Sequence, residues 1–499
     1  MSDTHFDVLI IGAGLSGVGA AWHLQTHCPG KRYAILEARD TMGGTWDLFR
    51  YPGIRSDSDM YTLGYSFRPW RQGKAIADGP SILKYVEETA QESGIDQHIR
   101  YGHRVTRLSW SSEEAAWTVE VEHQGKSRQL SCRFLINCSG YYRYDQGYAP
   151  EFPGSARFKG QIVHPQHWPQ DLDYRGKRVV VIGSGATAVT LVPAMAEEAV
   201  HVTMLQRSPT YIVSLPDVDL IARTLDRLLP PMAAYQLTRW KNVSLQTLFY
   251  NFCRRYPKLA RKMILSQLRA QLGEQFDIDT HFNPSYNPWE QRLCLVPNGD
   301  LFRALRKGRA SVETDQIEAF TEKGIRLQSG KELEADIIVT ATGLNMLILG
   351  GAEVWVDNAQ VDLAQTLNYR GSMLSDIPNL ALIMGYTNAS WTLKADLVSH
   401  YICRLINYMD RQGYAYCVPR EQGEVQKEPI LDLKSGYVLR ALNWLPKQGD
   451  RTPWRLNQNY LLDLLNFRFG ALTGAELEFV RPTQASATLN LSSPATASS

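Results

Sequence analysis

The sequence has few cysteines, and their arrangement suggests neither a metal site nor a disulfide framework. Seven cysteines are scattered over 499 residues without a Cys-x-x-Cys pair or a spacing typical of zinc ligands. An odd number of scattered cysteines is typical of a protein from a reducing compartment. We therefore expect neither disulfide bonds nor a bound metal ion.

Charge of one sign and long apolar runs are also scarce. Lys and Arg number 53 against 51 Asp and Glu, and the resulting net charge of +2 gives no case for a nucleic-acid partner. No stretch approaches the roughly 20 consecutive apolar residues of a membrane-spanning helix. No basic leader precedes the short apolar run at residues 8–11, as a secretion signal would require. We predict a cytoplasmic protein without a transmembrane segment.

What the chain does contain is a nucleotide-binding pattern at its start. Residues 6–11 are typical of a buried parallel strand, and a glycine turn, a helix and a second strand at 33–36 follow. Such a turn presents backbone N–H groups and a helix N-terminus to a pyrophosphate. Glu37, at the end of the second strand, is placed to bind an adenosine ribose, which favours FAD or NAD. The glycines of the turn are Gly12, Gly14 and Gly17.

The same order of elements recurs in the middle of the chain. A strand at residues 178–182 leads into a second glycine turn, a helix and a strand at 201–205. Arg207 and Ser208 follow where an acidic residue would otherwise stand, so a contact to a 2′-phosphate is available and NADPH is favoured. The second turn consists of Gly183, Ser184, Gly185, Ala186, Thr187 and Ala188.

Residues 217–289 interrupt this alternation of strands and helices, and they predict a helical insertion. Basic side chains are interleaved with apolar and aromatic ones, and acidic residues are few. The basic face is compatible with a solvated surface over a cleft, with contact to an anionic membrane or with guidance of an amphiphilic substrate. The basic residues are Arg223, Arg227, Arg239, Lys241, Arg254, Arg255, Lys258, Arg261, Lys262 and Arg269.

These patterns predict an α/β protein with two dinucleotide-binding, Rossmann-like domains. We expect an FAD-binding domain from residues 1–148 and 377–481, and an NADPH-binding domain from 149–216 and 290–376. The helical insertion, 217–289, belongs to the NADPH-binding domain. Residues 482–499 are rich in Ser, Thr, Ala and Pro and predict a disordered tail.

A fixed pattern of residue types lies between the two turns, from Phe158 through Gly160 and His164 to Trp168 and Pro169. Its place predicts the joint between the two domains. We interpret Phe158 and Trp168 as packing anchors and Gly160 as the site of a tight bend. For His164 we expect a part in hydrogen bonding and domain positioning rather than in general-base catalysis.

With further motifs, this pattern resembles the Baeyer-Villiger monooxygenases, class B flavoproteins that oxidise ketones to esters or lactones. The resemblance covers nearly the whole chain, and within that family it favours the subgroup of ethionamide-activating monooxygenases. The chain is also similar to the flavoprotein monooxygenases of long-chain alkane utilisation. The further motifs are Gly43-Gly44-Thr45-Trp46, Tyr51-Pro52-Gly53-Ile54-Arg55-Ser56-Asp57, Ser139-Gly140-Tyr141-Tyr142, Leu205-Gln206-Arg207-Ser208-Pro209, Pro288 to Cys294 and Ala389 to Lys394.

The resemblance implies a mechanism in which NADPH reduces FAD and a C4a-peroxyflavin formed from O2 attacks a carbonyl. Arg292 matches the catalytic arginine of the family, and Asp57 matches the acidic residue that orients it. Gln291 stands where many relatives have a lysine, which leaves Arg207 as the main ligand of the NADPH phosphate. The implied FAD contacts are Ser16, Thr45, Trp46, Asp57 and Val105, and the implied NADPH contacts are Arg55 and Ser56.

The substrate stays open at this point. Aliphatic or aryl ketones are expected, with S-oxygenation of thioethers or thioamides beside them. One alternative is a monooxygenase that acts mainly on sulfur or nitrogen centres or hydroxylates long-chain aliphatics. Another is a flavin-binding scaffold without turnover. A flavin disulfide reductase is excluded because residues 38–60 contain no cysteine.

Overall fold

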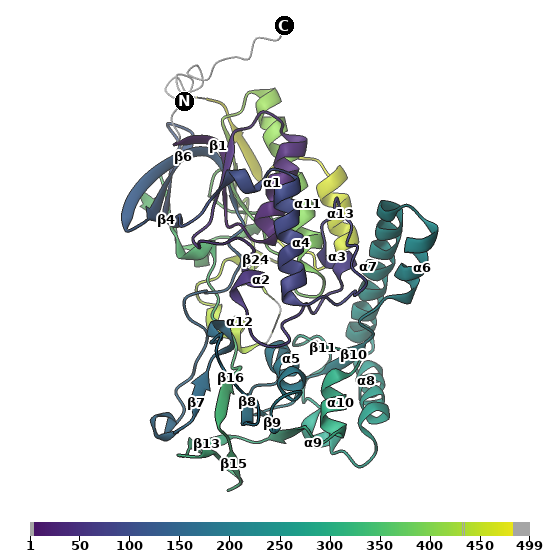
Figure 1. Ribbon diagram of the computed structural model, residues 1–499. Helices are drawn as coiled ribbons and strands as arrows, with labels where there is room; N and C mark the ends of the chain where they lie inside the picture. Colours follow the sequence, from purple (N-terminus) through teal and green to yellow (C-terminus); the bar gives the residue numbers. More distant parts are fainter. Residues whose placement is uncertain (1–3, 432, 434, 483–499) are drawn as a thin grey trace.

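The computed structural model describes residues 4–431, 433 and 435–482, and two large sheets dominate it (Figure 1). The parallel strands of the first sheet follow the order β3-β2-β1-β6-β21. Every residue of β2 is buried, as expected of a strand covered on both faces. These strands are β1 (His5–Ile11), β2 (Tyr33–Leu36), β3 (Ile99–Arg100), β6 (Lys126–Asn137) and β21 (Leu380–Leu382).

The second sheet repeats this arrangement. Its five strands are all parallel and follow the order β12-β9-β8-β16-β7. Counted from the strand before each glycine turn, β8 takes the place of β1 and β9 that of β2. The predicted α/β class with two dinucleotide-binding folds is confirmed. The strands are β7 (Gln161–Val163), β8 (Arg178–Ile182), β9 (His201–Gln206), β12 (Ala310–Thr314) and β16 (Ile337–Thr340).

An antiparallel extension widens the first sheet. β5 (Ala116–His123) pairs with the first half of β6, and β4 (Arg104–Ser111) pairs with β5. β5 turns alternate residues, such as Trp117 and Val119, into the core. β17 (Glu353–Val356) pairs with β4 in the same sheet. The chain has therefore returned to the first sheet before residue 353, and the expected end of the second domain at residue 376 was too late.

Both glycine turns press against the loop that follows a neighbouring strand. A Cβ on Gly12 would lie 2.7 Å from the carbonyl oxygen of Cys138, and one on Gly183 would lie 2.3 Å from that of Ala341. Both residues have φ in the left-handed region, at +100° and +135°. The turns thus lead tightly into α1 (Leu15–His27) and α5 (Ala186–Met195), at the carboxyl edge of each sheet.

Helices from distant parts of the chain cover the first sheet. α4 (Gly79–Glu92) and α11 (Trp391–Gln412) pack against α1, and α13 (Tyr460–Phe469) packs on α11 (Figure 1).

Outside the helical insertion, the other helices and strands are short. They are α2 (Thr45–Leu48), α3 (Met60–Leu63), α10 (Asp300–Arg306), α12 (Gly436–Ala441), β10 (Ile212–Leu215), β11 (Cys294–Pro297), β13 (Ile317–Phe320), β14 (Gly324–Leu327), β15 (Glu332–Glu334), β18 (Ala359–Gln360), β19 (Asn368–Tyr369), β20 (Met373–Leu374), β22 (Tyr416–Pro419), β23 (Lys427–Pro429), β24 (Lys447–Gly449) and β25 (Leu477–Val480).

The segment predicted as a helical insertion is helical, and it touches both domains. α8 contributes Ile264 and Leu268 to the core of the second domain, whereas α7 packs against α3 of the first. Arg239 of α7 is buried and donates hydrogen bonds to the carbonyl oxygens of Tyr61 and Gly64. It therefore does not belong to a solvated basic face. The helices are α6 (Leu220–Leu228), α7 (Pro231–Arg255), α8 (Pro257–Leu272) and α9 (Ile278–His281).

The cysteines and the ends of the chain complete the description. All seven cysteines are free and buried. Within the residues that the structure describes, no cluster of His, Cys, Asp or Glu could hold a metal ion. In the same part of the chain, no helix combines the length and the apolar character needed to cross a membrane. Of the tail predicted at 482–499, all but Pro482 lies outside the described residues.

Candidate functional site

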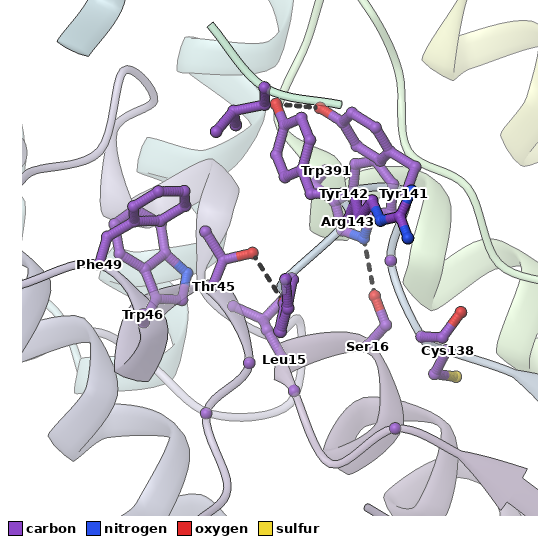
Figure 2. A pocket seen from close by; sticks show the side chains of 18 of the residues that line it. Leu15, Ser16, Thr45, Trp46, Phe49, Cys138, Tyr141, Tyr142, Arg143 and Trp391 are labelled. Carbon is purple, nitrogen blue, oxygen red and sulfur yellow. Dashed lines mark hydrogen bonds between the residues drawn. The ribbon is translucent and has the colours of Figure 1, made fainter. Parts of the chain in front are cut away.

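A cavity of about 720 Å³ opens at the carboxyl edge of the first sheet and extends towards the second domain. One end is walled by the first glycine turn, and the other by Arg292 and the start of α5. Figure 2 shows side chains from distant segments facing this space, among them Ser16, Thr45, Trp46 and Trp391. Carboxyl edges of parallel sheets are where nucleotides bind in such folds.

The first glycine turn and Glu37 form a cradle at one end of the cavity. Gly12, Gly14 and Glu37 line it, whereas Gly17 packs beneath, where a Cβ would lie 1.9 Å from the carbonyl oxygen of Gly12. The Glu37 carboxylate accepts hydrogen bonds from the backbone N–H groups of Ala13, at 2.8 Å, and Arg39, at 2.9 Å. Burial raises the pKa of Glu37 although both bonds favour its charged form. A buried, fixed acceptor of this kind suits a ribose hydroxyl.

The other residues expected beside FAD line the same cavity. Trp391 Nε1 donates a hydrogen bond of 2.7 Å to Ser16 Oγ, and Thr45 Oγ1 lies 3.3 Å from the Tyr144 hydroxyl. Trp46 and Val105 complete this group. The structure thus brings together residues from β4, α1, α2 and the start of α11 around one space.

Arg292 and Asp57 face the cavity together. Arg292 Nη2 lies 3.8 Å from Asp57 Oδ2, and the Arg292 side chain, which borders the open space, is 42% exposed. Burial would lower the pKa of Arg292, but attraction to Asp57 and to the hydroxyl groups of Tyr141 and Tyr142 outweighs it, so the pKa lies above its ordinary value. The site therefore contains a permanent, partly desolvated cation.

An aromatic wall beside this cation was missed as a functional element. Tyr141 stacks on Trp391 with ring centroids 5.1 Å apart, and its hydroxyl shares a hydrogen bond of 2.8 Å with that of Tyr142 (Figure 2). Burial raises the pKa of Tyr142 well above its ordinary value, so the phenol stays neutral. Tyr141, Tyr142 and Trp391 were noticed only as parts of motifs, which gave no reason to place them at one wall.

Helix α7 supports both segments that carry the charged pair. Asn242 and Gln246 each donate a hydrogen bond of 2.8 Å to Asp59, two residues after Asp57. On the same helix Tyr250 packs edge-on against Trp289, at 5.3 Å. Trp289 has a φ of +69°, an uncommon backbone conformation for a bulky residue, in the turn that leads to Arg292.

The second glycine turn contributes only partly to the cavity. Ala186 and Thr187 line it together with Arg55 and Ser56. Arg55 forms an ion pair with Asp300 of α10, which ties the first domain to the second. The remaining residues of the predicted NADPH set do not border the cavity; they are Gly183, Ser184, Gly185, Ala188, Arg207 and Ser208.

Beside the second glycine turn lies an exposed cation, Arg207. Ser184 Oγ lies 2.8 Å from Thr210 Oγ1 and donates a hydrogen bond to the carbonyl oxygen of Ser208. Arg207 is exposed at the end of β9, and no ion pair joins it to any residue that the structure describes. Gln291 does not line the cavity either. Arg207 can therefore reach an anionic group outside the cavity.

The segment from Phe158 to Trp168, which we expected to join the two domains, is packed into the second domain. Its central residues form β7, the edge strand of the second sheet, and Phe158 is buried against Phe320 in that domain. Gly160 does not have a left-handed φ; it is required because a Cβ would lie 2.2 Å from the Asp336 carbonyl oxygen. The chain does bend at Gly160, as expected, but the need for glycine comes from this close approach rather than from a left-handed φ. Trp168 packs, half-buried, against the core of the second domain.

His164 and Gln166, in the second half of this pattern, contact the loop 143–147, part of which borders the cavity. His164 packs so closely on Gly147 that a Cβ there would lie 2.1 Å from the imidazole. Burial lowers the pKa of His164, which keeps the ring neutral. The buried Gln166 Nε2 donates hydrogen bonds of 2.8 Å to the carbonyl oxygens of Arg143 and Tyr144. Gln166 was missed, although it lies within the pattern.

Comparison with known proteins decides the family. Residues 76–366, more than half of the chain, match the family described as flavin-binding monooxygenase-like. The chain therefore belongs to this family. Residues 10–74 match an NAD(P)-binding Rossmann-like domain. The family membership predicted from the motifs is confirmed.

Relatives from two bacterial genera match almost end to end. The FAD-containing monooxygenase EthA of Mycobacterium tuberculosis is 60% identical over 479 residues, which cover 96% of this chain and 98% of that protein. The probable FAD-binding monooxygenase AlmA of Acinetobacter baylyi is 51% identical over 94% of this chain and 95% of its own.

Solved structures of two monooxygenases share the fold. An oxidized steroid monooxygenase bound to NADP superimposes with a TM-score of 0.75 at 22% identity, over 96% of this chain and all of that one. A cyclohexanone monooxygenase from Rhodococcus bound to NADP+ gives a TM-score of 0.74 at 19% identity and the same coverage. At this identity the likeness concerns the fold alone.

Proposed function

We propose that this flavin-binding monooxygenase contains FAD, consumes NADPH and carries out Baeyer-Villiger oxidation. It inserts one oxygen atom of O2 next to the carbonyl of aliphatic or aryl ketones and so forms esters. Thioethers and thioamides are second substrates, oxygenated at sulfur. The observation that carries the proposal is the Arg292 and Asp57 pair, which faces the same cavity as a nucleotide cradle.

The residues present fit FAD at the first glycine turn. Gly14 faces the cavity, and the nearest atom to a Cβ built there is 3.6 Å away, so its lack of a side chain serves an approaching ligand rather than the protein core. Glu37 would bind the ribose, and the start of α1 would face the pyrophosphate. The relative EthA is an FAD-containing monooxygenase, and AlmA is a probable FAD-binding monooxygenase.

NADPH fits the second turn. Gly185 has no atom within 4 Å of a Cβ position, which leaves its backbone open to a pyrophosphate at the start of α5. The exposed Arg207 would pair with the 2′-phosphate. Thr187, Arg55 and Ser56 lie where the cavity meets this domain, and they would contact the nicotinamide half. The steroid and cyclohexanone monooxygenase structures were both determined with NADP bound.

The protein's own contribution to the reaction is electrostatic. Bound FAD, reduced by NADPH, would supply the activation of dioxygen. Arg292 then provides a cation that cannot lose its proton, at the place where negative charge develops on oxygen. Asp57 restricts the orientations of that guanidinium, and Tyr141 and Trp391 form an apolar wall that limits the access of water.

Product analysis under isotopically labelled dioxygen tests this proposal. The panel should contain 2-ketones, cyclic ketones and aryl sulfides, each with the purified protein and NADPH. We expect labelled ester from at least one class of ketone, and NADPH oxidation that the ketone stimulates. Labelled sulfoxide or alcohol without any labelled ester would instead support an enzyme of sulfur centres or of aliphatic hydroxylation. Bound flavin that NADPH does not bleach would indicate a non-catalytic scaffold.

A further inference from the structure

A large set of apolar side chains is exposed on neighbouring helices of the insertion and on α13. Leu220, Leu228 and Phe469 expose 72%, 73% and 74% of their surface, far more than a packed position would. Monomeric proteins rarely expose contiguous apolar patches of this kind unless something binds there. We call the set the apolar surface, and it consists of Leu220, Ile221, Leu228, Leu237, Trp240, Leu245, Leu248, Leu259, Met263, Leu461, Leu462, Leu465 and Phe469.

These residues belong to one side of the molecule. α6 packs along α7, and α7 continues into α8 through Tyr256, which caps both helices. Trp240 of α7 contacts Tyr460 at the start of α13, with ring centroids 5.9 Å apart. Figure 1 shows α6, α7 and α13 next to one another at the edge of the molecule. The helices that carry the exposed side chains therefore lie together on one side of the molecule.

Positive charge accompanies the apolar surface. Between residues 220 and 272 the sequence has ten Lys and Arg residues but a single acidic residue, Asp226. Arg223, Arg227, Lys258 and Lys262 are exposed among the apolar side chains of α6 and α8. The chain as a whole carries a net charge of only +2, so this local excess of cations is specific to the surface.

Two acidic side chains beside this surface are paired, whereas Asp226 of α6 is exposed and has no ion pair among the described residues. Asp219 forms an ion pair with Lys241, and the buried Asp463 of α13 forms one with Lys394. Neither carboxylate would repel an anionic partner strongly. Exposed leucines and aromatics flanked by Lys and Arg are the pattern of helices that lie in the interface of an anionic bilayer.

We propose that this surface docks the protein onto an anionic lipid bilayer. The leucines and aromatics of α6, α7, α8 and α13 enter the boundary between headgroups and acyl chains, and the basic residues contact lipid phosphates. The surface lies next to a wall of the cavity: a small pocket between α7 and residues 458–460 has Ala389 in its lining, and Ala389 also borders the main cavity. Docking would therefore bring that wall close to the lipid.

Co-sedimentation of the full-length, FAD-loaded protein with lipid vesicles tests the proposal. We expect binding to vesicles of phosphatidylglycerol and phosphatidylcholine, weaker binding to phosphatidylcholine alone, and loss of binding as salt is raised. In the double variant Leu220→Ser with Leu228→Ser, binding to vesicles should be weaker by a factor of about ten or more. The double variant Arg223→Glu with Arg227→Glu should lose on the order of 30-fold in partitioning.

Matched controls come from exposed residues of the second domain. Ile162 and Val200 expose 44% and 63% of their surface, and their double serine variant should bind vesicles as the unmodified protein does. The charge control is Arg157→Glu with Lys177→Glu, two exposed cations outside the surface. Flavin absorbance and Tm establish that each variant is folded.

Two outcomes would overturn the proposal. One is absence of binding to anionic vesicles by the unmodified protein. The other is equal weakening by the surface variants and by the controls. A concentration-dependent dimer that does not bind vesicles, and that the Leu220 and Leu228 variant dissociates in analytical ultracentrifugation, would assign the surface to a second copy of the chain. Neither result would bear on the proposed oxygenation, because the product analysis that tests it is carried out without lipid.

Discussion

Arg292 and Asp57 face the cavity side by side, with Nη2 and Oδ2 3.8 Å apart, although three strands of the second sheet, β7, β8 and β9, and the helical insertion lie between them in the chain. Helix α7 contacts the segments on both sides of this pair, through Asp59 and through Trp289. The insertion is therefore part of the support of the site. The pair and its support can be tested by substitution.

Replacement of Arg292 by alanine should abolish oxygenation while leaving the nucleotide sites intact. Without the cation nothing fixed stabilises the charge that develops on oxygen, and we expect the rate of ester formation to fall about a hundredfold or more. FAD content and NADPH-driven flavin reduction should be unchanged, as measured by visible absorbance. An ester yield equal to that of the unmodified protein would remove Arg292 from the catalytic role.

Asp57 should act only through Arg292. We expect Asp57→Ala to lower product formation about tenfold, because the guanidinium then has more orientations open to it. In the presence of Arg292→Ala the same substitution should cost nothing further. Product rates of the two single variants and the double variant measure this coupling. Fully additive losses would show that Asp57 has a separate role.

The two glycines of the first turn should respond differently to alanine. Gly17→Ala places a Cβ 1.9 Å from the Gly12 carbonyl oxygen, so it should lower stability by about 2 kcal/mol or more. Gly14→Ala meets nothing closer than 3.6 Å and should fold normally, but with less bound FAD, because the methyl group stands in the way of the pyrophosphate. Tm and flavin content separate the two effects.

The matched control for this comparison is Gly185→Ala in the second turn, where no atom lies within 4 Å of the new Cβ. We expect it to raise the KM for NADPH and to leave the FAD content unchanged. Full FAD occupancy in Gly14→Ala would contradict the assignment of FAD to the first turn.

Local patterns were sufficient for the nucleotide folds. A buried strand, a glycine turn and a helix are adjacent in the chain, and β8 begins and ends at the predicted residues, 178 and 182. The lining residues Ser16, Thr45 and Trp46 could be named in advance because they lie in motifs that resemble those of a known family. Their roles as cofactor ligands stay predictions.

Contacts between distant segments could not be read from the sequence. Arg239, like the exposed Arg223, lies on a helix of the insertion. Its burial is explained by partners in distant segments, the carbonyl groups of Tyr61 and Gly64 and the carboxylate of Asp396. The pairing of β17 with β4 likewise joins strands that are far apart in the chain. For that reason the predicted boundary at residue 376 came too late.

Arg207 should set the preference between NADPH and NADH. Its exposed guanidinium, without an ion pair to the described residues, is available to the 2′-phosphate, so Arg207→Ala should raise the KM for NADPH about tenfold or more. The KM for NADH should stay the same, because NADH lacks that phosphate. Arg175→Ala, which removes another exposed arginine of this domain, serves as the control. Equal effects on both nucleotides would place the 2′-phosphate elsewhere.

A cluster of imidazoles between α1 and α11 should make stability depend on pH. Burial lowers the pKa of His400 to about 4, and repulsion from His27, His23, Arg468 and Arg404 adds to the shift. The unfolded chain therefore binds a proton at about 6.5 that the folded protein does not take up until the pH is near 4. The contribution of His400 to the free energy of unfolding is therefore most favourable above pH 6.5, and it is lost as the pH falls from 6.5 to 4.

We therefore expect Tm to fall as the pH is lowered from 7.5 to 4.5, and the fall to be smaller in His400→Gln, which has no imidazole to protonate. His27→Gln should also reduce the fall, because one of the groups that repel a protonated His400 is then absent. Thermal unfolding at a series of pH values measures both effects. An identical fall in His400→Gln and in the unmodified protein would show that acid destabilises the fold through other groups.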